Sequence, residues 1–291
     1  MAITNAITSL RCGSKTLDLS VPRVMGILNV TPDSFSDGGA FLDEEKALMQ
    51  AGRMIDAGAA IIDIGGESTR PGSEPVSAQE ELGRTIPVLK EAVTRYPDTL
   101  FSIDTTKYEV AAQAIEAGAV IVNDVSGLQK EPRFAELCAA TGAAYICMHS
   151  KGEPKTMQQQ PHYNDVLGEV YAFFEEALNK LQRAGVAHVI LDPGIGFGKT
   201  LEHNLQLIAN LQHFAKLNHP LLVGASRKSM IGSVLKGRAP EGRLAGTLAV
   251  HYHCLQQGAK LLRVHDVEEA VDSVALFAAI DRHSRDTKKN P

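Results

Sequence analysis

The segment LFSIDTTKYEVAAQAIEAGAVIVND, residues 100–124, contains one complete structural unit of the chain. Its mostly apolar residues 100–103 predict a buried strand, residues 108–117 have the spacing of an amphipathic helix, and residues 120–122 predict the next strand. Gly118 follows the helical pattern, where a glycine often ends a helix. Apolar strands that alternate with helices indicate a parallel sheet covered on both faces.

The same alternation extends in both directions along the chain. Further strands are predicted at 24–30, 60–64, 144–148, 189–191, 221–223 and 261–264. Further helices are predicted at 44–56, 79–93, 132–141, 163–184, 201–217, 244–257 and 267–282. Eight strand–helix units fit an α/β protein with a single (β/α)8 TIM barrel. An open doubly wound sheet is the alternative, because periodicity does not show whether a sheet closes.

The chain of 291 residues contains no Gly-, Pro- and Ser-rich linker, so we expect one main domain. We assign residues 1–22 to a short N-terminal extension, for which a hairpin across the bottom of the barrel is one arrangement. Residues 23–283 form the expected barrel, and residues 284–291 form an expected flexible tail.

Composition narrows the class of protein. The net charge of −5 gives no support for a nucleic-acid partner. The N-terminus lacks a signal-peptide pattern, and the apolar runs are shorter than the roughly 18 residues of a membrane span. We therefore expect a cytoplasmic protein without membrane association. The cysteines fit no zinc spacing and are expected to be buried thiols in a reducing compartment; they are Cys12, Cys138, Cys147 and Cys254.

Polar or glycine-rich residues follow almost every predicted strand. They are Asn29, the run 65–72, Asp104, Asn123 with Asp124, His149, Asp192 with the run 193–199, the run 224–229, and Arg263 with His265. The carboxyl ends of barrel strands meet on one face, where barrel enzymes place their sites. We therefore expect one shared small-molecule site at this face rather than a set of separately solvated strand ends.

Three of these polar residues suit a flat heterocycle. Asp104 and Asp192 offer hydrogen-bond acceptors, and Asn123 offers both a donor and an acceptor. Such a set matches the edge of an aminopyrimidinone ring. Helix capping is the alternative explanation for Asp104 or Asn123 taken separately.

Basic residues lie near the same strand ends in a chain that is acidic overall. They are Arg70, Arg227, Lys228, Arg263 and His265. Together with the glycine-rich loops they indicate an anionic ligand such as phosphate, whereas each one alone equally fits a solvated loop. Asn29, Asp33 and Asp37 offer oxygens for Mg²⁺, without a strong metal-binding spacing. The run 194–199 resembles a phosphate loop but lacks the spacing of the known fingerprints.

Two motifs resemble the signatures of the dihydropteroate synthase family: GILNVTPDSFSDGG at residues 26–39 and GESTRPG at residues 66–72. Further matches follow in order at 102–105, 123–127, 191–199, 226–229 and 263–267. The resemblance covers about residues 23–282. It implies a TIM barrel that joins 6-hydroxymethyl-7,8-dihydropterin diphosphate to para-aminobenzoate. The family's reaction is dissociative: cleavage of the C–O bond gives a pterin-stabilised cation, which the aniline nitrogen attacks.

The resemblance also implies roles for individual residues. The pterin would be bound by Asp104, Asn123, Met148, Asp192, Phe197, Gly224 and Lys228. The diphosphate would be bound by Asn29, Thr69, Arg263 and His265. The aminobenzoate pocket would include Phe35, Arg70, Pro71, Phe197, Lys228 and Ser229. Mg²⁺ is the implied cofactor, with Asn29 as its ligand and Asp37 as a further candidate. Because the family is commonly dimeric, a homodimer is expected.

One departure from the family pattern follows Met148 and His149, where residues 150–152 read Ser-Lys-Gly instead of the frequent Met-Gln-Gly. It affects the expected shape of the fifth loop rather than the activity. Three other functions remain open: a pterin-binding methyltransferase, a Schiff-base aldolase with Lys228 as nucleophile, and an inactive pterin-binding module. A methyltransferase has no need of a diphosphate clamp or of the loop 68–71. Loss of Asn29 or Arg263 would favour an inactive module, and both residues are present.

Overall fold

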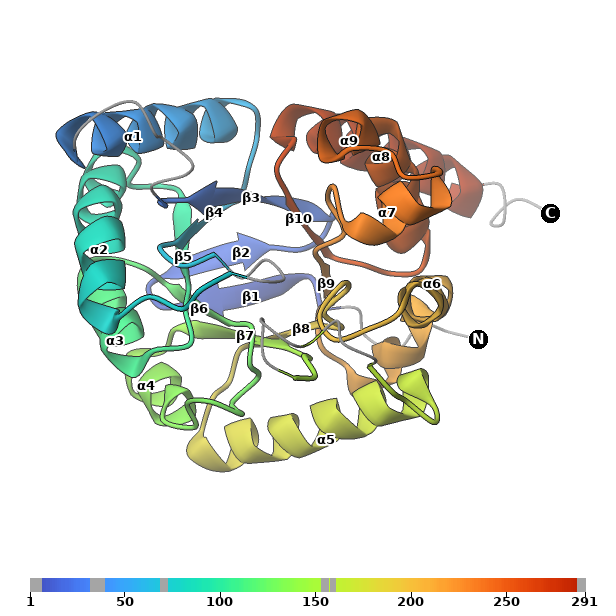
Figure 1. The fold of residues 1–291 in the computed structure, drawn as a ribbon, viewed down its shortest axis with the longest axis horizontal. Helices are drawn as coiled ribbons and strands as arrows, with labels where there is room; N and C mark the ends of the chain where they lie inside the picture. Colours follow the sequence, from blue (N-terminus) through green and yellow to red (C-terminus); the bar gives the residue numbers. More distant parts are fainter. Residues whose placement is uncertain (1–6, 32–39, 69–72, 153–156, 158–160, 287–291) are drawn as a thin grey trace.

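The computed structural model of this chain is a barrel of strands surrounded by helices (Figure 1). It describes residues 7–31, 40–68, 73–152, 157 and 161–286. The barrel strands are β3 (Arg23–Asn29), β4 (Ile61–Gly65), β5 (Leu100–Asp104), β6 (Ile121–Asp124), β7 (Ala144–Met148), β8 (Val189–Asp192), β9 (Leu222–Val223) and β10 (Leu261–Val264). Each of these strands overlaps a segment that the sequence predicts as a strand, with bounds that differ by at most two residues at either end.

The strands form a closed parallel barrel. Neighbouring strands pair in the order β8-β7-β6-β5-β4-β3-β10-β9. A parallel bridge between Leu191 and Leu221 joins β8 to the residue before β9, and the Leu191 N–H donates to the Pro220 carbonyl at 2.9 Å. These contacts link the two ends of the sheet, so the TIM barrel is confirmed and the open doubly wound sheet is excluded.

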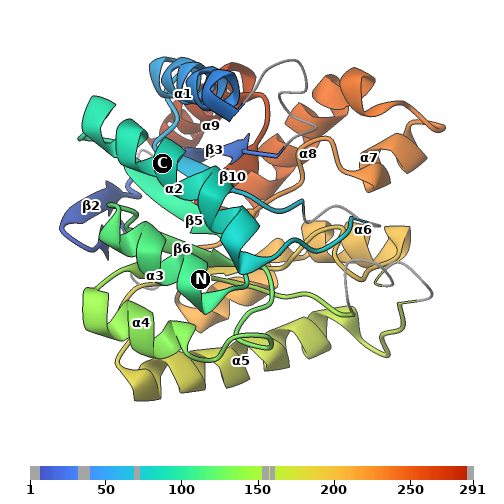
Figure 2. The same ribbon diagram turned by 60° about the vertical axis from the view of Figure 1, so that its left-hand side comes forward.

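Helices connect the strands and cover the outside of the barrel (Figure 2). They are α1 (Ala40–Asp56), α2 (Ala78–Arg95), α3 (Tyr108–Glu116), α4 (Phe134–Thr141), α5 (Val166–Ala184), α6 (Leu201–Ala209), α7 (Ser229–Val234), α8 (Leu244–Gln256) and α9 (Val267–Asp286). The short 3₁₀ helices η2 (Leu211–Leu217) and η3 (Pro240–Arg243) complete the described elements. The sequence does not predict α7 or η3.

The single helix predicted at 201–217 is wrong. The α-helix α6 ends at Ala209. The next residue, Asn210, has a φ of −120°, outside the helical region, and η2 follows it. Leu207, Leu211 and Phe214 are nevertheless all buried. The apolar spacing therefore continues across the break, because both short helices turn the same side toward the core.

The N-terminal residues form a hairpin at the amino end of the barrel (Figure 2). Strands β1 (Ser9–Cys12) and β2 (Lys15–Asp18) pair antiparallel. Leu10, Cys12, Leu17 and Leu19 pack in one buried cluster with the first residues of the barrel strands, among them Met25, Ile61 and Leu100. This hairpin closes the end of the barrel opposite the carboxyl ends of the strands.

The boundaries proposed for the extension, the barrel and the tail stay predictions. Residues 284–286, which the sequence analysis placed in the tail, are the last residues of α9. The four cysteines are buried and free, in agreement with expectation. No helix in the described part of the chain is long and apolar enough to cross a bilayer.

Candidate active site

Several predicted site residues lie at neighbouring positions at the carboxyl ends of the strands. In the strand register Asn29 lies beside Gly65, Gly65 beside Asp104, and Asp104 beside Asn123. On the other side of the barrel Met148 lies beside Asp192. The sequence prediction that these side chains share one face is therefore correct.

A network of buried charges forms the floor of this face. The Arg263 Nε donates to Asp63 Oδ2 at 2.7 Å, and Arg263 Nη2 donates to Asp104 Oδ2 at 2.6 Å. The Asn123 amide also donates to Asp63 Oδ2, at 2.9 Å. Asp63 is 1% exposed, and Arg263 is its ion-pair partner among the described residues. The sequence analysis missed Asp63, although a carboxylate inside the apolar strand β4 was a visible signal.

Two oxygens of this network have no partner within the described residues: Asp63 Oδ1 and Asp104 Oδ1. Burial raises the pKa of Asp104 to about 7, and repulsion from Asp63 adds to this effect, although the Arg263 charge opposes it. Buried polar atoms are normally hydrogen-bonded, and such orphaned acceptors indicate a place for donors from a ligand. The floor is therefore suited to a molecule that presents N–H groups.

Asp192 is the second buried acceptor of the site. Its Oδ1 accepts from the Gly194 N–H at 2.8 Å, while Oδ2 lies 3.8 Å from the position of a Cβ atom built on Gly224. Burial raises the pKa of Asp192, and the Gly194 hydrogen bond and the charge of Lys228 oppose this. Gly224 thus lies between Asp192 and the Arg263 Cβ, which is 3.9 Å from the same built atom.

Lys228 and Phe197 face each other from two different loops. The Lys228 Nζ lies 4.1 Å from the centroid of the Phe197 ring, within the range of a cation–π contact. Phe197 follows β8 and Lys228 follows β9. The two predicted pterin-binding residues are therefore brought together, as the resemblance implied.

The candidate phosphate-binding residues His265 and Arg227 have different hydrogen-bond partners. His265 Nδ1 lies 3.1 Å from Ser226 Oγ, and both residues are near the Arg263 end of the site. The Arg227 guanidinium instead pairs with Asp266, with Nε donating to Oδ2 at 3.0 Å. Ser229 is exposed at the start of α7. Arg227 is therefore held in an ion pair with Asp266, and its role in binding an anion stays a prediction.

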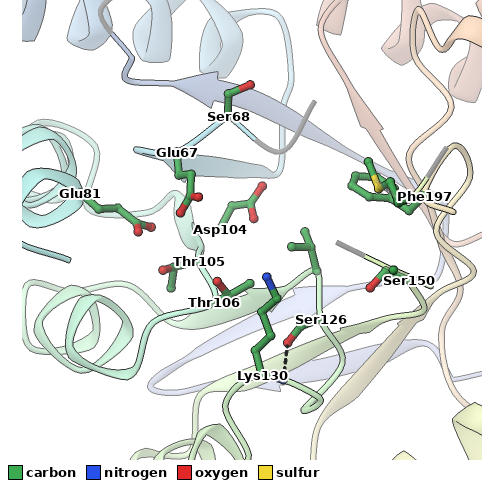
Figure 3. Close-up of a pocket in the computed structure, with 13 residues that line it drawn as sticks. Glu67, Ser68, Glu81, Asp104, Thr105, Thr106, Ser126, Lys130, Ser150 and Phe197 are labelled. Atoms are coloured by element: carbon green, nitrogen blue, oxygen red, sulfur yellow. Dashed lines mark hydrogen bonds between the residues drawn. The ribbon is translucent and has the colours of Figure 1, made fainter. Parts of the chain in front are cut away.

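A cavity lies beside Asp104 and is lined by residues from several strand ends (Figure 3). Glu67, Glu81 and Asp104 lie together on one side, and Phe197 lies at the other. Lys107 forms ion pairs with both Glu67 and Glu81, the latter at 2.6 Å. Glu81 is fully buried on α2, and its Oε1 has no partner in the described part of the chain. The sequence analysis missed this group, because Glu81 stands in a helix rich in charged residues.

The run 194–199, compared above with a phosphate loop, does not present its lysine to the site. Lys199 is buried, and its Nζ donates to the carbonyl oxygens of Gly194 and Phe197 at 2.9 and 3.0 Å. A phosphate-binding lysine would instead keep its donors for the ligand. The run therefore differs from the known phosphate loops in the use of its lysine as well as in its spacing.

Several predicted residues cannot be placed. Phe35, Asp37, Thr69, Arg70 and Pro71 lie outside the described residues. Within the described ranges no group of three or more His, Cys, Asp or Glu side chains is arranged to hold a metal ion. Asn29, at the end of β3, is half-buried and offers one amide oxygen.

A TIM barrel with an acidic floor at the carboxyl ends of its strands is an architecture suited to binding a pterin. The family model described as pterin binding enzyme matches residues 25–265. The dihydropteroate synthase of Escherichia coli strain K12 is 50% identical over 266 residues, which cover 91% of this chain and 93% of the relative. That of Haemophilus influenzae is 45% identical over 272 residues, 93% of this chain and 98% of the relative.

Solved structures agree with these relatives. Dihydropteroate synthase of Yersinia pestis in a sulfonamide complex has a TM-score of 0.88 at 46% identity, covering 94% of this chain and 99% of the other. The Xanthomonas albilineans enzyme with 4-aminobenzoic acid has a TM-score of 0.88 at 42% identity, covering 94% and 98%. The chain belongs to the dihydropteroate synthase family of pterin-binding enzymes.

Proposed function

We propose that this chain is a transferase of folate biosynthesis that condenses 6-hydroxymethyl-7,8-dihydropterin diphosphate with para-aminobenzoate. The products are 7,8-dihydropteroate and diphosphate. The observation that carries the proposal is the buried acidic floor beside Arg263, where Asp63 and Asp104 each keep one oxygen that no described residue contacts by a hydrogen bond. Family membership and the fold of the solved relatives support it.

The floor residues would recognise the pterin edge. Asp104 and Asp192 are buried acceptors for ring and amino N–H groups, and Asn123 is held in place by its bond to Asp63. Met148 and Gly224 would pack against the ring, and Lys228 would donate to a ring atom from its place beside Phe197. Because the site is largely buried, these hydrogen bonds act in a low local dielectric and gain strength.

The leaving group is an anion, so the chain must stabilise negative charge. Arg263, on β10, and His265, which directly follows this strand, are two residues apart, and both would face the diphosphate. Positive groups aimed at the oxygen that takes the electrons of the breaking C–O bond lower the barrier to cleavage. The aniline nitrogen of para-aminobenzoate then forms the new C–N bond and releases a proton.

Asn29 suits a Mg²⁺ ion that is held mainly by its substrate. Mg²⁺ takes oxygen ligands, keeps several waters and often binds through substrate phosphates with few protein ligands. One amide oxygen at the end of β3 fits such a site, whereas the described residues offer no carboxylate cage. Bound Mg²⁺ would supply charge neutralisation on the diphosphate, and Asn29 would orient it.

Removal of divalent metal is expected to suppress turnover, because the diphosphate then leaves without charge neutralisation. Product formation should be measured with excess chelator and again after Mg²⁺ is restored. Asn29→Ala is expected to raise the Mg²⁺ concentration needed for half-maximal rate. Full activity in chelator would contradict this role of the metal.

The proposed reaction is tested by mixing the protein with the pterin diphosphate, para-aminobenzoate and Mg²⁺ and looking for 7,8-dihydropteroate. Release of diphosphate in equal amount is expected. The aldolase alternative requires a neutral Lys228, whereas Lys228 lies near enough to Asp192 for its positive charge to lower the pKa of that carboxyl. Borohydride should therefore trap no substrate on the protein, and a reduced adduct on Lys228 would overturn the synthase proposal.

We also propose that the protein works in the cytoplasm as a homodimer. Leu276 and Ile280 on α9 are 63% and 55% exposed, and their spacing places them on one face of that helix. Such an apolar face is suited to an interface between copies. Light scattering should give twice the mass of one chain, and Leu276→Asp should shift it toward one chain. A single-chain mass for the unmodified protein would contradict the dimer.

A further inference from the structure

Lys199 is a buried lysine whose hydrogen bonds, among the described residues, lie within two neighbouring loops. It is 2% exposed, and its Nζ contacts His149 Nδ1 at 2.9 Å, the Gly194 carbonyl at 2.9 Å, the Phe197 carbonyl at 3.0 Å and the His149 carbonyl at 3.2 Å. None of these partners is a carboxylate. A lysine is seldom buried this far without a paired acid, so its position needs an explanation beyond ordinary packing.

The pKa values of Lys199 and His149 agree with a hydrogen bond between their side chains. Burial lowers the pKa of His149 to about 2, and the Lys199 charge adds to the effect, so the imidazole is neutral. Burial also lowers the pKa of Lys199 to about 7. A neutral ring whose Nδ1 lacks a proton accepts from the Lys199 amine in either of its protonation states.

The same two loops also touch through their backbones. A Cβ atom at Gly194, whose φ is +67°, would lie 1.9 Å from the His149 carbonyl oxygen. A Cβ atom at Gly198, whose φ is +63°, would lie 2.0 Å from the Lys151 carbonyl oxygen. Only glycine permits this approach, so the loop after β8 is seated directly on the segment after β7.

Lys199 holds Phe197, the residue of this loop that faces the substrate site. Its bond to the Phe197 carbonyl fixes the backbone of that residue, and the Phe197 ring lies under the Lys228 ammonium and lines the cavity beside Asp104. A second anchor comes from Asn204, whose Oδ1 accepts from the Gly196 N–H at 2.7 Å. The loop is thus fixed on both sides of the phenylalanine.

We propose that Lys199 is a positioning residue that joins the loop after β8 to the segment after β7 and so holds Phe197 against Lys228 in the substrate site. The proposal rests on the proposed function, in which Phe197 and Lys228 bind the substrates. Lys199 itself touches neither substrate. Loss of the Lys199 side chain should therefore weaken substrate binding through Phe197. It should leave in place Arg263 and His265, the charged groups that would face the diphosphate.

The first test is Lys199→Met, which keeps the length of the side chain and removes its donors. We expect KM for at least one substrate to rise by about 10-fold while kcat changes far less, because a displaced binding group costs affinity. Lys180→Met is the matched control. Lys180 is exposed on α5 and pairs with Glu176 at 2.7 Å. The control should leave both constants unchanged.

A double-mutant cycle distinguishes positioning from general stability. If Lys199 acts through Phe197, then adding Lys199→Met to Phe197→Leu should cause little further rise in KM. Lys199→Met combined with Asn29→Ala should be additive, because Asn29 lies on β3. Calorimetry with the pterin diphosphate gives the same comparison without turnover.

Other outcomes overturn the proposal. A Lys199→Met protein that melts at a lower temperature but keeps its KM values would show a purely structural lysine, and full additivity with Phe197→Leu would break the link between them. If Lys199→Met does not fold, Lys199→Gln takes its place in the test. Glutamine keeps a donor but is shorter than lysine, so KM must still rise. An unchanged KM overturns the proposal. Absence of dihydropteroate from the unmodified protein would instead reject the proposed function.

Discussion

Replacing Arg263 by Met is expected to lower the free energy of unfolding by about 3–5 kcal/mol, the usual cost of removing one partner from a buried ion pair. Arg263 is the cation that contacts both Asp63 and Asp104, and both carboxyls are nearly inaccessible to solvent. Without it one carboxyl must take up a proton or remain charged in a medium of low dielectric. Urea unfolding followed by circular dichroism measures the loss.

Arg227→Met is the matched control for this measurement. Arg227 also pairs with an aspartate, Asp266, but its side chain is 37% exposed. Exposed pairs are typically worth about 0–1 kcal/mol, because water screens the charges. Equal losses for the two variants would contradict the assignment of Arg263 as the charge that supports the floor. Arg263→Lys should fall between them, since a point charge cannot reproduce two directed bonds.

The strands could be predicted from the sequence because each is an apolar run followed by a helical pattern. The strand predicted at 144–148 has the same bounds as β7. Closure of the barrel could not be predicted, because it depends on the bridge between Leu191 and Leu221. Such a pairing of distant segments leaves no trace in the periodicity of either strand.

Helices could be predicted where a regular apolar pattern marks the side that faces the core. The predictions failed where the same pattern fits two kinds of helix, or where the helix is too short to show a pattern. The spacing of Leu207, Leu211 and Phe214 is the same whether or not the helix breaks at Asn210. Only the backbone angles at Asn210 show the change from α-helix to 3₁₀ helix. Helix α7 has six residues, too few for a period to be recognised.

The site residues at strand ends could be predicted because a barrel places those ends on one face. Asp104, Asn123 and Arg263 do meet there, and the structure adds Asp63 as the common partner of Asn123 and Arg263. Glu81 was missed for a different reason. Its burial comes from contacts with Gly66 and Lys107, on other parts of the chain, which the helix sequence alone does not show.

Asp192→Asn is expected to weaken pterin binding by one to two orders of magnitude, because a charge-assisted hydrogen bond contributes roughly 1.5–3 kcal/mol. The Asp192 Oδ1 already accepts from the Gly194 N–H, so the asparagine oxygen should keep that bond and place its NH₂ group at the other position. A donor would then face the donors of the pterin. The change also removes a negative charge that lies near Lys228 and Arg263.

The measurement is the pterin Kd by calorimetry, with Asp165→Asn as the control. Asp165 is the exposed N-cap of α5 and accepts from the Leu167 N–H, a role that asparagine fills equally well. The control should therefore bind the pterin as the unmodified protein does. Asp192→Asn should keep the same melting temperature to within a few degrees if the Gly194 bond is retained. A pterin Kd unchanged by Asp192→Asn would show that this carboxylate does not contact the ring, and the floor would then consist of Asp104 and its partners alone.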